Sequence, residues 1–472
     1  MNTAKNIYLL GICGTGMAAL AAMLKSQGYI VSGSDENAYP PMSTFLASQN
    51  IPVYAGFNVT NIEAAKPDLV IIGNALSRGN PEVEHILNHK LDFLSMPAAL
   101  SDFFIRGKYS CVVTGTHGKT TTTSLLAWIL EAAGQNPSFF VGGLPENFKQ
   151  GFQLSDGRHF VSEGDEYDSA FFDKGPKFLH YRPDLLIINN IEFDHADIYK
   201  DLTEIKTAFR RLINIVPGKG HIVANADDAV VAELLQKAFS NVQLFGLSEK
   251  AAWRASEIQF DGNGTAFTIE HNHEPVCHIQ SPMMGMHNVR NVLASFISAT
   301  LLGLSPDQIA SGVHSFQGVR RRMDKLGEIG DVLVFEDFAH HSTAVKETLE
   351  GVRLRFPDRR IWAIFEPRTA SAKRKVFELT YYHAFDEADQ VIFAAMHRPD
   401  KVPESERMSI PNIINALHER GISARSVSQN EDLLSYLPTE ARPGDVFIFM
   451  SNGSFDGIPG RFVEALSNIH QQ

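Results

Sequence analysis

Short apolar runs alternate with amphipathic stretches along the whole chain. In residues 5 to about 106, the runs NIYLLG and DLVIIGNA have the composition of buried strands. Met17 to Gln27 has the spacing of a helix that ends near Gly28. Alternating strands and helices are typical of a mostly parallel sheet with helices on both faces, so the pattern predicts an α/β fold.

The same alternation continues in two further segments. From about 107 to 317 the predicted strands are KYSCVVTG, HFVSE, DLLIINNI and GHIVAN, and FDGNGTAFTIEH predicts a hairpin around an Asn-Gly turn. Helices are predicted from about His287 to Leu302 and after Ser305. From about 318 to 472 the predicted strands are DVLVFEDF, RIWAIFEP, ADQVIFAAM and GDVFIFMSNG. We therefore predict three α/β domains, 1–106, 107–317 and 318–472.

The composition narrows the class of protein. A chain of 472 residues with 44% hydrophobic and 20% charged residues is typical of a soluble globular protein. The net charge of -12 argues against nucleic acid as a partner. No apolar run reaches the roughly 20 residues that span a bilayer, and the N-terminus shows no signal peptide. Three cysteines without CxxC spacing favour a reducing cytoplasm.

The segment VVTGTHGKTTTTSLL predicts a phosphate-binding loop. Lys119 and Thr120 stand at the start of a helix whose apolar face is formed by Leu125, Leu126, Ile129 and Leu130. A helix N-terminus offers free N–H groups to an anion, lysine adds positive charge, and a threonine hydroxyl suits Mg²⁺. The spacing is more compact than GxxxxGK[ST], and a turn that only caps the helix is the alternative. The candidate nucleotide-binding residues are Gly115, Thr116, His117, Gly118, Lys119, Thr120 and Thr121.

Two later strands are predicted to end in polar side chains at the same edge of the sheet. The segment EGDEYD places Glu163, Asp165, Glu166 and Asp168 after one strand, where Glu163 would ligate Mg²⁺ with Thr120. A solvated acidic turn is the alternative. The next strand is followed by Asn189, Asn190, Asp194, His195 and Asp197, and His195 is either a metal ligand, a phosphoryl contact or a structural histidine.

A second glycine turn lies near the N-terminus. The segment LLGICGTGMAAL places Gly11, Gly14 and Gly16 between a strand and a helix, which lets a ligand phosphate approach the helix N-terminus. Ser34 and Asp35 follow the next strand, where they could bond a ribose or a base. Glycines that serve only close packing are the alternative.

Candidate ligand-binding side chains also lie nearer the C-terminus. Asn288 and Asn291 share one helix face and suit an adenine or a ribose. At most one or two of Arg320, Arg321 and Arg322 can reach a common phosphate, because adjacent side chains do not face alike. The segment FEDFAHHSTA adds Asp337, His340 and His341, for which substrate or nucleotide contact is favoured over metal binding.

In order along the chain, GICGTGM, GTHGKTT, EGDEYD, NNIEFDH, GMHNVRN and DFAHH resemble the motifs of the Mur ligases. The resemblance spans essentially all residues. YPPMS, IGNALSRGNPEVE, SAFFDKGPKFLHYRP, FEPRT and MSNGSFDGI are more similar to the murein peptide ligase branch, which recycles cell-wall peptide, than to the branch that adds L-alanine. The resemblance implies an N-terminal Rossmann-like UDP-binding domain, a central P-loop ATPase domain and a C-terminal Rossmann-like domain that brings the amine.

The resemblance also implies a reaction. ATP and Mg²⁺ would support amide formation between the lactyl carboxylate of UDP-N-acetylmuramate and the amine of L-Ala-γ-D-Glu-meso-diaminopimelate, the murein tripeptide, through an acyl phosphate. The enzyme is expected to be a monomer or a weak homodimer. The alternatives are L-alanine addition by the same chemistry, a nucleotide-dependent dehydrogenase, and a nucleotide sensor without catalysis.

The same resemblance assigns roles to residues. Lys119 would hold the ATP phosphates, Thr120 and Glu163 one Mg²⁺, and His195 and Glu163 a second. Asn288 and Asn291 would contact adenosine, Arg322 a phosphate and Asp337 the ribose side. The UDP part would lie against Gly14, Thr15, Gly16, Ser34 and Asp35. The remaining substrate candidates are Asn190, His340, His341, Arg368 and Ser451.

Two positions depart from relatives in the family. Where some members carry a carbamylated lysine that supports the second metal, this chain has Arg210, which cannot form that carbamate, so His195 is expected to give the support. Arg368 in FEPRT stands where the L-alanine-adding members carry a different pattern. Their amino-acid contacts are therefore not expected here.

Overall fold

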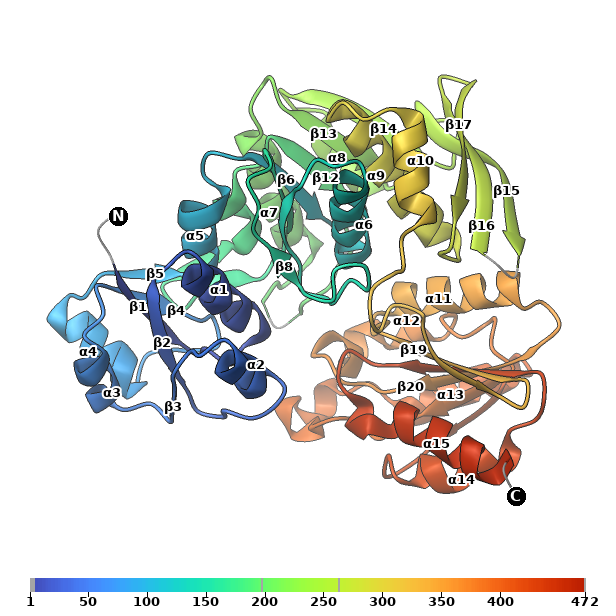
Figure 1. The fold of residues 1–472 in the computed structure, drawn as a ribbon. Helices are drawn as coiled ribbons and strands as arrows, with labels where there is room; N and C mark the ends of the chain where they lie inside the picture. The colour runs from blue at the N-terminus through green and yellow to red at the C-terminus, as the bar shows by residue number, and fades with distance from the viewer. Residues whose placement is uncertain (1–4, 197, 262–263, 471–472) are drawn as a thin grey trace.

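The computed structural model describes residues 5–196, 198–261 and 264–470. Three large sheets follow one another along the described chain (Figure 1). The predicted α/β fold is confirmed. Asp197 and residues 262–263, which include the asparagine of the predicted Asn-Gly turn, lie outside the described residues.

The first sheet has five parallel strands in the order β3-β2-β1-β4-β5. Helix α1 follows the glycine turn after β1, as predicted. The elements are β1 (Asn6–Leu10), α1 (Thr15–Ser26), β2 (Ile30–Asp35), α2 (Met42–Ser48), β3 (Val53–Ala55), α3 (Val59–Ala65), β4 (Leu69–Ile72), α4 (Pro81–His89), β5 (Phe93–Ser95) and α5 (Met96–Leu100).

The central sheet has ten strands in the order β17-β16-β15-β14-β13-β12-β6-β9-β7-β8. Strands β16, β17 and β8 run antiparallel to their neighbours, and the others run parallel. The elements are β6 (Tyr109–Thr114), α6 (Lys119–Ala132), β7 (Ser138–Phe140), β8 (Phe152–Gln153), β9 (His159–Glu163), β12 (Leu185–Ile188), α7 (Leu202–Ile215), β13 (His221–Asn225), α8 (Ala229–Leu235), β14 (Asn241–Gly246), β15 (Trp253–Asp261), β16 (Gly264–His271), β17 (Glu274–Ser281), α9 (Met286–Leu301) and α10 (Pro306–His314). A separate two-stranded sheet is formed by β10 (Asp168–Ala170) and β11 (Asp173–Pro176).

The third sheet has six strands in the order β18-β19-β23-β20-β21-β22, and β18 alone runs antiparallel. Helix α11 lies on the side of this domain that faces the central domain (Figure 1). The elements are β18 (Asp324–Ile329), β19 (Val332–Asp337), α11 (Ser342–Arg355), β20 (Arg360–Phe365), α12 (Glu378–Tyr381), β21 (Gln390–Phe393), α13 (Ile410–Glu419), β22 (Ser423–Ser426), α14 (Asp432–Glu440), β23 (Asp445–Met450) and α15 (Ile458–His470).

The central strand order explains how the candidate residues converge. Strand β6 pairs with β12 on one side and β9 on the other, all parallel, so their carboxyl ends meet at one edge. The apolar face predicted for α6 is fully buried against the sheet.

The proposed domain boundaries near 106 and 318 fall in the segments between β5 and β6 and between β17 and β18, which join the sheets. None of the described helices is long and apolar enough to cross a membrane.

Candidate active site

A glycine loop joins β6 to α6 at the edge where the strands end. Gly118 has a φ of +79°, and a Cβ there would lie 2.6 Å from the side-chain oxygen of Asn291. Gly115 has a φ of +133°, and a Cβ there would lie 3.0 Å from backbone atoms of Asn190. Any larger residue would therefore displace the loop from α9 or from the segment after β12. The side chain of Asn190 accepts the backbone N–H of His117 at 2.7 Å, which fixes the loop further.

Lys119 is charged and held over its own loop. Its Nζ donates to the carbonyl oxygen of Gly115 at 2.6 Å and lies 3.0 Å from Oε2 of Glu166. Burial acts to lower the pKa of Lys119, but the carboxylates of Glu166, Asp165 and Glu163 outweigh it and raise that pKa above its usual value. The lysine thus stays cationic beside the helix N-terminus, as a phosphate-binding group requires.

Thr120 and Glu163 form an oxygen-rich pair that fits Mg²⁺. The Thr120 hydroxyl donates to Oε1 of Glu163 at 2.8 Å, and the backbone N–H of Gly142 donates to Oε2 at 2.9 Å. Hydroxyl and carboxylate oxygens are the hard ligands that Mg²⁺ prefers. The two side chains predicted to share an ion therefore lie next to each other.

Glu166 links the loop to His195, a role that the sequence did not reveal. Its Oε1 lies 3.0 Å from Nε2 of His195, while the same carboxylate pairs with Lys119. Burial acts to lower the pKa of His195, but the Glu166 carboxylate outweighs it, so that pKa is raised. His195 has a φ of +57°, and its ring lies 4.2 Å from that of Tyr167, centroid to centroid. The expected partner of His195 was Glu163, whereas its nitrogen faces Glu166.

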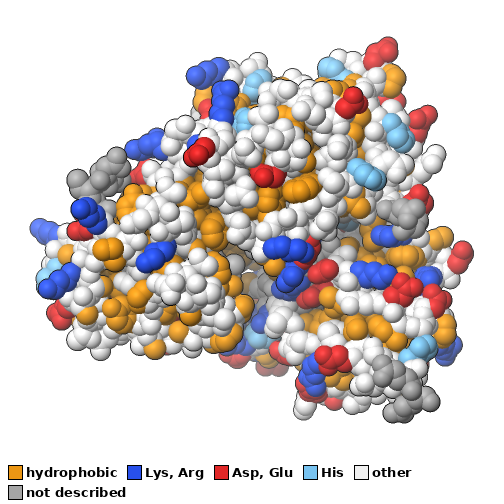
Figure 2. All heavy atoms as spheres, in the orientation of Figure 1, with side chains coloured by type: hydrophobic (Ala, Val, Ile, Leu, Met, Phe, Trp, Pro, Cys, Tyr) orange, Lys and Arg blue, Asp and Glu red, His pale blue; other side chains and the backbone are white. Residues whose placement is uncertain are grey.

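A polar cavity of about 890 Å³ lies between the central and C-terminal domains. Figure 2 shows the surface hollowed between the domains, with basic and acidic side chains gathered beside the hollow. Of the residues expected from the sequence, the cavity is lined by Thr116, His117, Gly118, Lys119, Thr120, Thr121, Glu163, Asn190, His195, Asn288, Asn291, Arg322, Asp337 and His340.

The three adjacent arginines face different surroundings. Arg322 lines the cavity, with its guanidinium 4.3 Å from the centre of the Phe338 ring and 3.4 Å from the Thr120 hydroxyl. Arg321 pairs with Glu336 at 2.7 Å in the C-terminal domain, and Arg320 is exposed and pairs with Glu146 at 2.6 Å. Arg322 is therefore the arginine placed to meet a phosphate in this cavity.

Asn288 and Asn291 of α9 are linked to the glycine loop by a hydrogen bond from α6. Asn291 accepts a hydrogen bond from the Thr122 hydroxyl at 3.1 Å and donates to the side-chain oxygen of Asn288 at 2.9 Å. Asp337, at the end of β19, accepts backbone N–H groups of Met323 and Ala339. These side chains are ordered by the protein on one side and face the cavity on the other.

The side chains predicted to bind UDP lie in the N-terminal domain. Gly14 precedes α1, Thr15 and Gly16 begin it, and Asp35 accepts the backbone N–H of Cys13 at 2.9 Å, which holds the glycine turn. Ser34 is fully buried, and its hydroxyl donates to Oε2 of buried Glu82 at 2.5 Å. Its side chain supports the turn from within the core and does not face a ligand.

Several other expected residues lie outside the cavity lining. Ser451 is buried and bonds Glu366, and Arg368 lies 3.4 Å from Glu366 in the same domain. His341 caps α11. Arg210 is exposed on α7, so the carbamate position of other members of the family does not line this cavity.

Three family models match the chain in succession. The description "Mur ligase family, catalytic domain" matches residues 6–108, "Mur ligase middle domain" residues 113–299, and "Mur ligase, glutamate ligase domain" residues 321–453. Together they cover most of the chain and coincide with its three sheets.

Curated relatives match at nearly full length. Proteins of Haemophilus influenzae and Escherichia coli, both named UDP-N-acetylmuramate–L-alanyl-γ-D-glutamyl-meso-2,6-diaminoheptandioate ligase, are 37% and 38% identical. Each alignment covers 98% of this chain and 99% and 98% of the relative. A UDP-N-acetylmuramate–L-alanine ligase of Acetivibrio thermocellus is 33% identical, with 96% and 94% covered.

Solved structures of two related ligases are similar to this chain. A murein peptide ligase of Psychrobacter arcticus has a TM-score of 0.71 and 35% identity, with 98% of both chains covered. A UDP-N-acetylmuramate–alanine ligase of Thermotoga maritima has a TM-score of 0.80 at 24% identity, with 98% and 99% covered, and at that identity shows a shared fold.

Proposed function

The chain belongs to the Mur ligase family, and we propose that it joins the lactyl carboxylate of UDP-N-acetylmuramate to the amine of L-Ala-γ-D-Glu-meso-diaminopimelate at the expense of ATP. The match to two ligases named for this reaction, 37% and 38% identical over 98% of the chain, carries the proposal. Two contacts support it further: Lys119 pairs with Glu166 beside the helix N-terminus, and Thr120 bonds Glu163. We place the reaction in the cytoplasm; Cys13, Cys111 and Cys277 are free.

The two reacting groups, the substrate carboxylate and the γ-phosphate of ATP, are both negatively charged. A carboxylate is a poor electrophile, and ATP activates it by transferring its γ-phosphoryl group to a carboxylate oxygen. Two anions must then approach each other. Lys119, Arg322 and the N-terminus of α6 offset their repulsion. When bound, Mg²⁺ adds charge neutralisation to the phosphates. Thr120 and Glu163 would hold one ion, and His195 with a neighbouring carboxylate would hold a second.

Other cavity residues orient the two reactants. Asn288 and Asn291 would contact adenosine, and Asp337 would face the ribose. The glycine turn before α1 would hold the UDP part through Gly14, Thr15 and Gly16, with Asp35 keeping the turn in place. The far parts of both substrates thereby position the carboxylate and the phosphate for reaction.

His340 can accept a hydrogen bond from the incoming amine. Its Nδ1 lies 3.0 Å from the carbonyl oxygen of Phe338, so the protonated Nδ1 donates there and Nε2 keeps a lone pair. Burial lowers the pKa of His340 to about 4, so the ring is neutral at the pH of the cytoplasm. The imidazole lines the cavity, where its Nε2 lone pair can accept a hydrogen bond.

We expect His340→Ala to lower turnover about 10-fold, the scale of one lost hydrogen bond to the incoming amine. Because a His pKa near 4 leaves the ring neutral above about pH 5, the ratio of wild-type to variant turnover should stay constant within about twofold from pH 6 to 8. Steady-state rates of both proteins across this range measure the ratio. A ratio that falls about fourfold toward pH 6, as an ordinary His pKa of about 6.5 would give, would refute the assignment.

The choice of amine separates this proposal from L-alanine addition. With UDP-N-acetylmuramate and Mg-ATP, we expect phosphate release to be at least about 100-fold faster with the tripeptide than with L-alanine at equal concentration, since remote binding energy supports the reacting end. Mass spectrometry should show the UDP-N-acetylmuramoyl tripeptide. Faster turnover with L-alanine would reassign the enzyme to the synthetic branch. If neither amine causes phosphate release, the result would favour the alternative of a nucleotide sensor without catalysis.

A further inference from the structure

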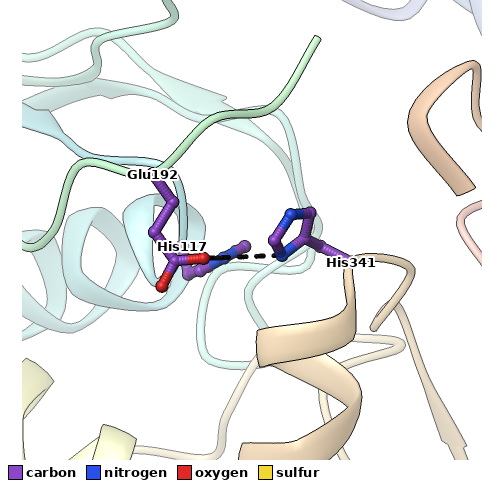
Figure 3. A group of neighbouring side chains, drawn as sticks. All are labelled: His117, Glu192 and His341. Carbon is purple, nitrogen blue, oxygen red and sulfur yellow. Dashed lines mark hydrogen bonds and ion pairs between the residues drawn. The ribbon is translucent and has the colours of Figure 1, made fainter. Parts of the chain in front are cut away.

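Three side chains from separate parts of the chain meet where the central and C-terminal domains join (Figure 3). His117 comes from the glycine loop, Glu192 from the segment after β12, and His341 from the N-cap of α11. Nε2 of His117 lies 3.4 Å and Nδ1 of His341 3.5 Å from Oε2 of Glu192. The three donor atoms all lie within 4.8 Å of one another. Only His117 of the three lines the nucleotide cavity.

These separations suit an ion between the side chains better than direct hydrogen bonds. A hydrogen bond of nitrogen to oxygen is usually about 2.7–3.2 Å long, shorter than either contact. Zinc bonds of about 2.0–2.2 Å in a tetrahedron place neighbouring donors roughly 3.3–3.5 Å apart. Two imidazoles and one carboxylate are also a common ligand set for Zn²⁺.

The carboxylate of Glu192 and the ring of His341 are in the protonation states that metal binding needs. Burial acts to raise the pKa of Glu192, but His117, Thr343 and His341 outweigh it and lower that pKa to about 2. Burial lowers the pKa of His341, so its ring is neutral. The backbone N–H of Thr343 donates to Nδ1 of His341 at 3.4 Å, which marks that nitrogen as the one with the lone pair; a bound ion would take this lone pair in place of the long cap hydrogen bond.

The surroundings hold the donors in place and favour positive charge. The Thr343 hydroxyl donates to Oε2 of Glu192 at 2.7 Å, and Asn190 fixes the backbone of His117. Buried Asp194 lies near enough to His341 to act on its charge, and His340, also neutral, adds no cation. A divalent ion would therefore meet two carboxylates and no uncompensated positive group on these elements.

We propose that His117, Glu192 and His341 form a binding site for a borderline divalent transition metal ion, Zn²⁺ or Co²⁺, separate from the Mg²⁺ ligands Thr120 and Glu163. The fourth position is open to water. A bound ion would tie the phosphate loop to α11 and so hold the central and C-terminal domains in the present arrangement. The proposal assigns His341 to the metal in place of the peptide contact expected from the sequence.

Cobalt gives a direct test, because four-coordinate Co²⁺ absorbs visible light. The full-length protein is titrated with Co²⁺ in excess Mg²⁺, which occupies the oxygen-rich site. We expect one visible-absorbing Co²⁺ per chain, displaced by Zn²⁺. Glu192→Gln keeps the shape of the side chain but removes the charged ligand, and should weaken Co²⁺ binding at least about tenfold. Glu233→Gln, at an exposed acid that pairs with Lys206, is the matched control and should bind Co²⁺ as the wild type does.

His341→Ala provides a second, independent removal of a ligand and should also weaken Co²⁺ binding at least about tenfold. Zn²⁺ should raise the thermal midpoint of the wild type and not that of Glu192→Gln. Wild-type protein without a visible Co²⁺ band, or wild-type affinity in both variants, would overturn the proposal. None of these readouts requires ligation, so the result is independent of the proposed activity.

Discussion

Lys119→Ala is expected to lower ligation at least about 100-fold while the Kd for UDP-N-acetylmuramate changes less than about twofold. The ammonium is the mobile positive charge of the phosphate loop, and removal of one such electrostatic contact costs about 100- to 1,000-fold in turnover. The glycine turn before α1 belongs to another domain and keeps its contacts. Phosphate release and calorimetric titration of the nucleotide sugar measure the two effects.

The structure dictates the controls for this variant. Lys119 neutralises Glu166, whose side chain is 3% exposed, so loss of the lysine leaves a buried carboxylate that destabilises the fold by about 3–5 kcal/mol. The double variant Lys119→Ala/Glu166→Gln removes that charge and should restore the thermal midpoint but not ligation. Lys177→Ala breaks a similar pair with Asp165, at 2.7 Å, and should keep most activity. Normal turnover by folded Lys119→Ala would show that this loop is not the phosphate site.

Glu163→Ala is expected to raise the Mg²⁺ concentration for half-maximal activity by about 10- to 100-fold, the cost of losing a metal-positioning group. The carboxylate is held by the Thr120 hydroxyl and by the backbone N–H of Gly142, which orient it beside its fellow ligand. A Mg²⁺ titration of activity at saturating ATP gives the measurement.

Asp168→Ala is the matched control for Glu163→Ala. Asp168 belongs to the same acidic segment but pairs with exposed Lys174 at 2.5 Å, and exposed pairs contribute little. We expect its Mg²⁺ titration to equal that of the wild type. If Glu163→Ala also titrates like the wild type, the ion is held elsewhere.

Much of the fold was predictable because local pattern and topology agree. Buried parallel strands read as continuous apolar runs, and β6, β12 and β19 lie where such runs predict them. The antiparallel hairpin of β15 and β16 was predicted from its turn, whereas β18 and the β10–β11 pair escaped prediction for a physical reason. Strand β18 is half-exposed, with a Gly327 irregularity, and β10 with β11 is short, so neither carries an apolar run.

Site residues could be predicted where a residue type that suits the chemistry also stands at a predicted strand end or helix start. Lys119, Thr120 and Glu163 each follow from a residue type at a strand end or a helix start. Glu166 and Glu192 were not assigned roles, because their importance arises from partners remote in the chain. Glu166 contacts Lys119 and His195, and Glu192 lies between His117 and His341. Ser34 was expected to contact the UDP part, but its hydroxyl donates to buried Glu82. No local sequence pattern indicates where Glu82 lies.

The transfer of phosphate to the sugar carboxylate is tested most directly by oxygen labelling. UDP-N-acetylmuramate carrying ¹⁸O in both oxygens of its lactyl carboxylate is turned over with Mg-ATP and the tripeptide. If a carboxylate oxygen attacks the γ-phosphorus and the amine then displaces that oxygen with the phosphate, each released phosphate carries one ¹⁸O and the amide carbonyl keeps the other. Unlabelled phosphate, formed together with the amide product, would contradict activation by ATP at this carboxylate.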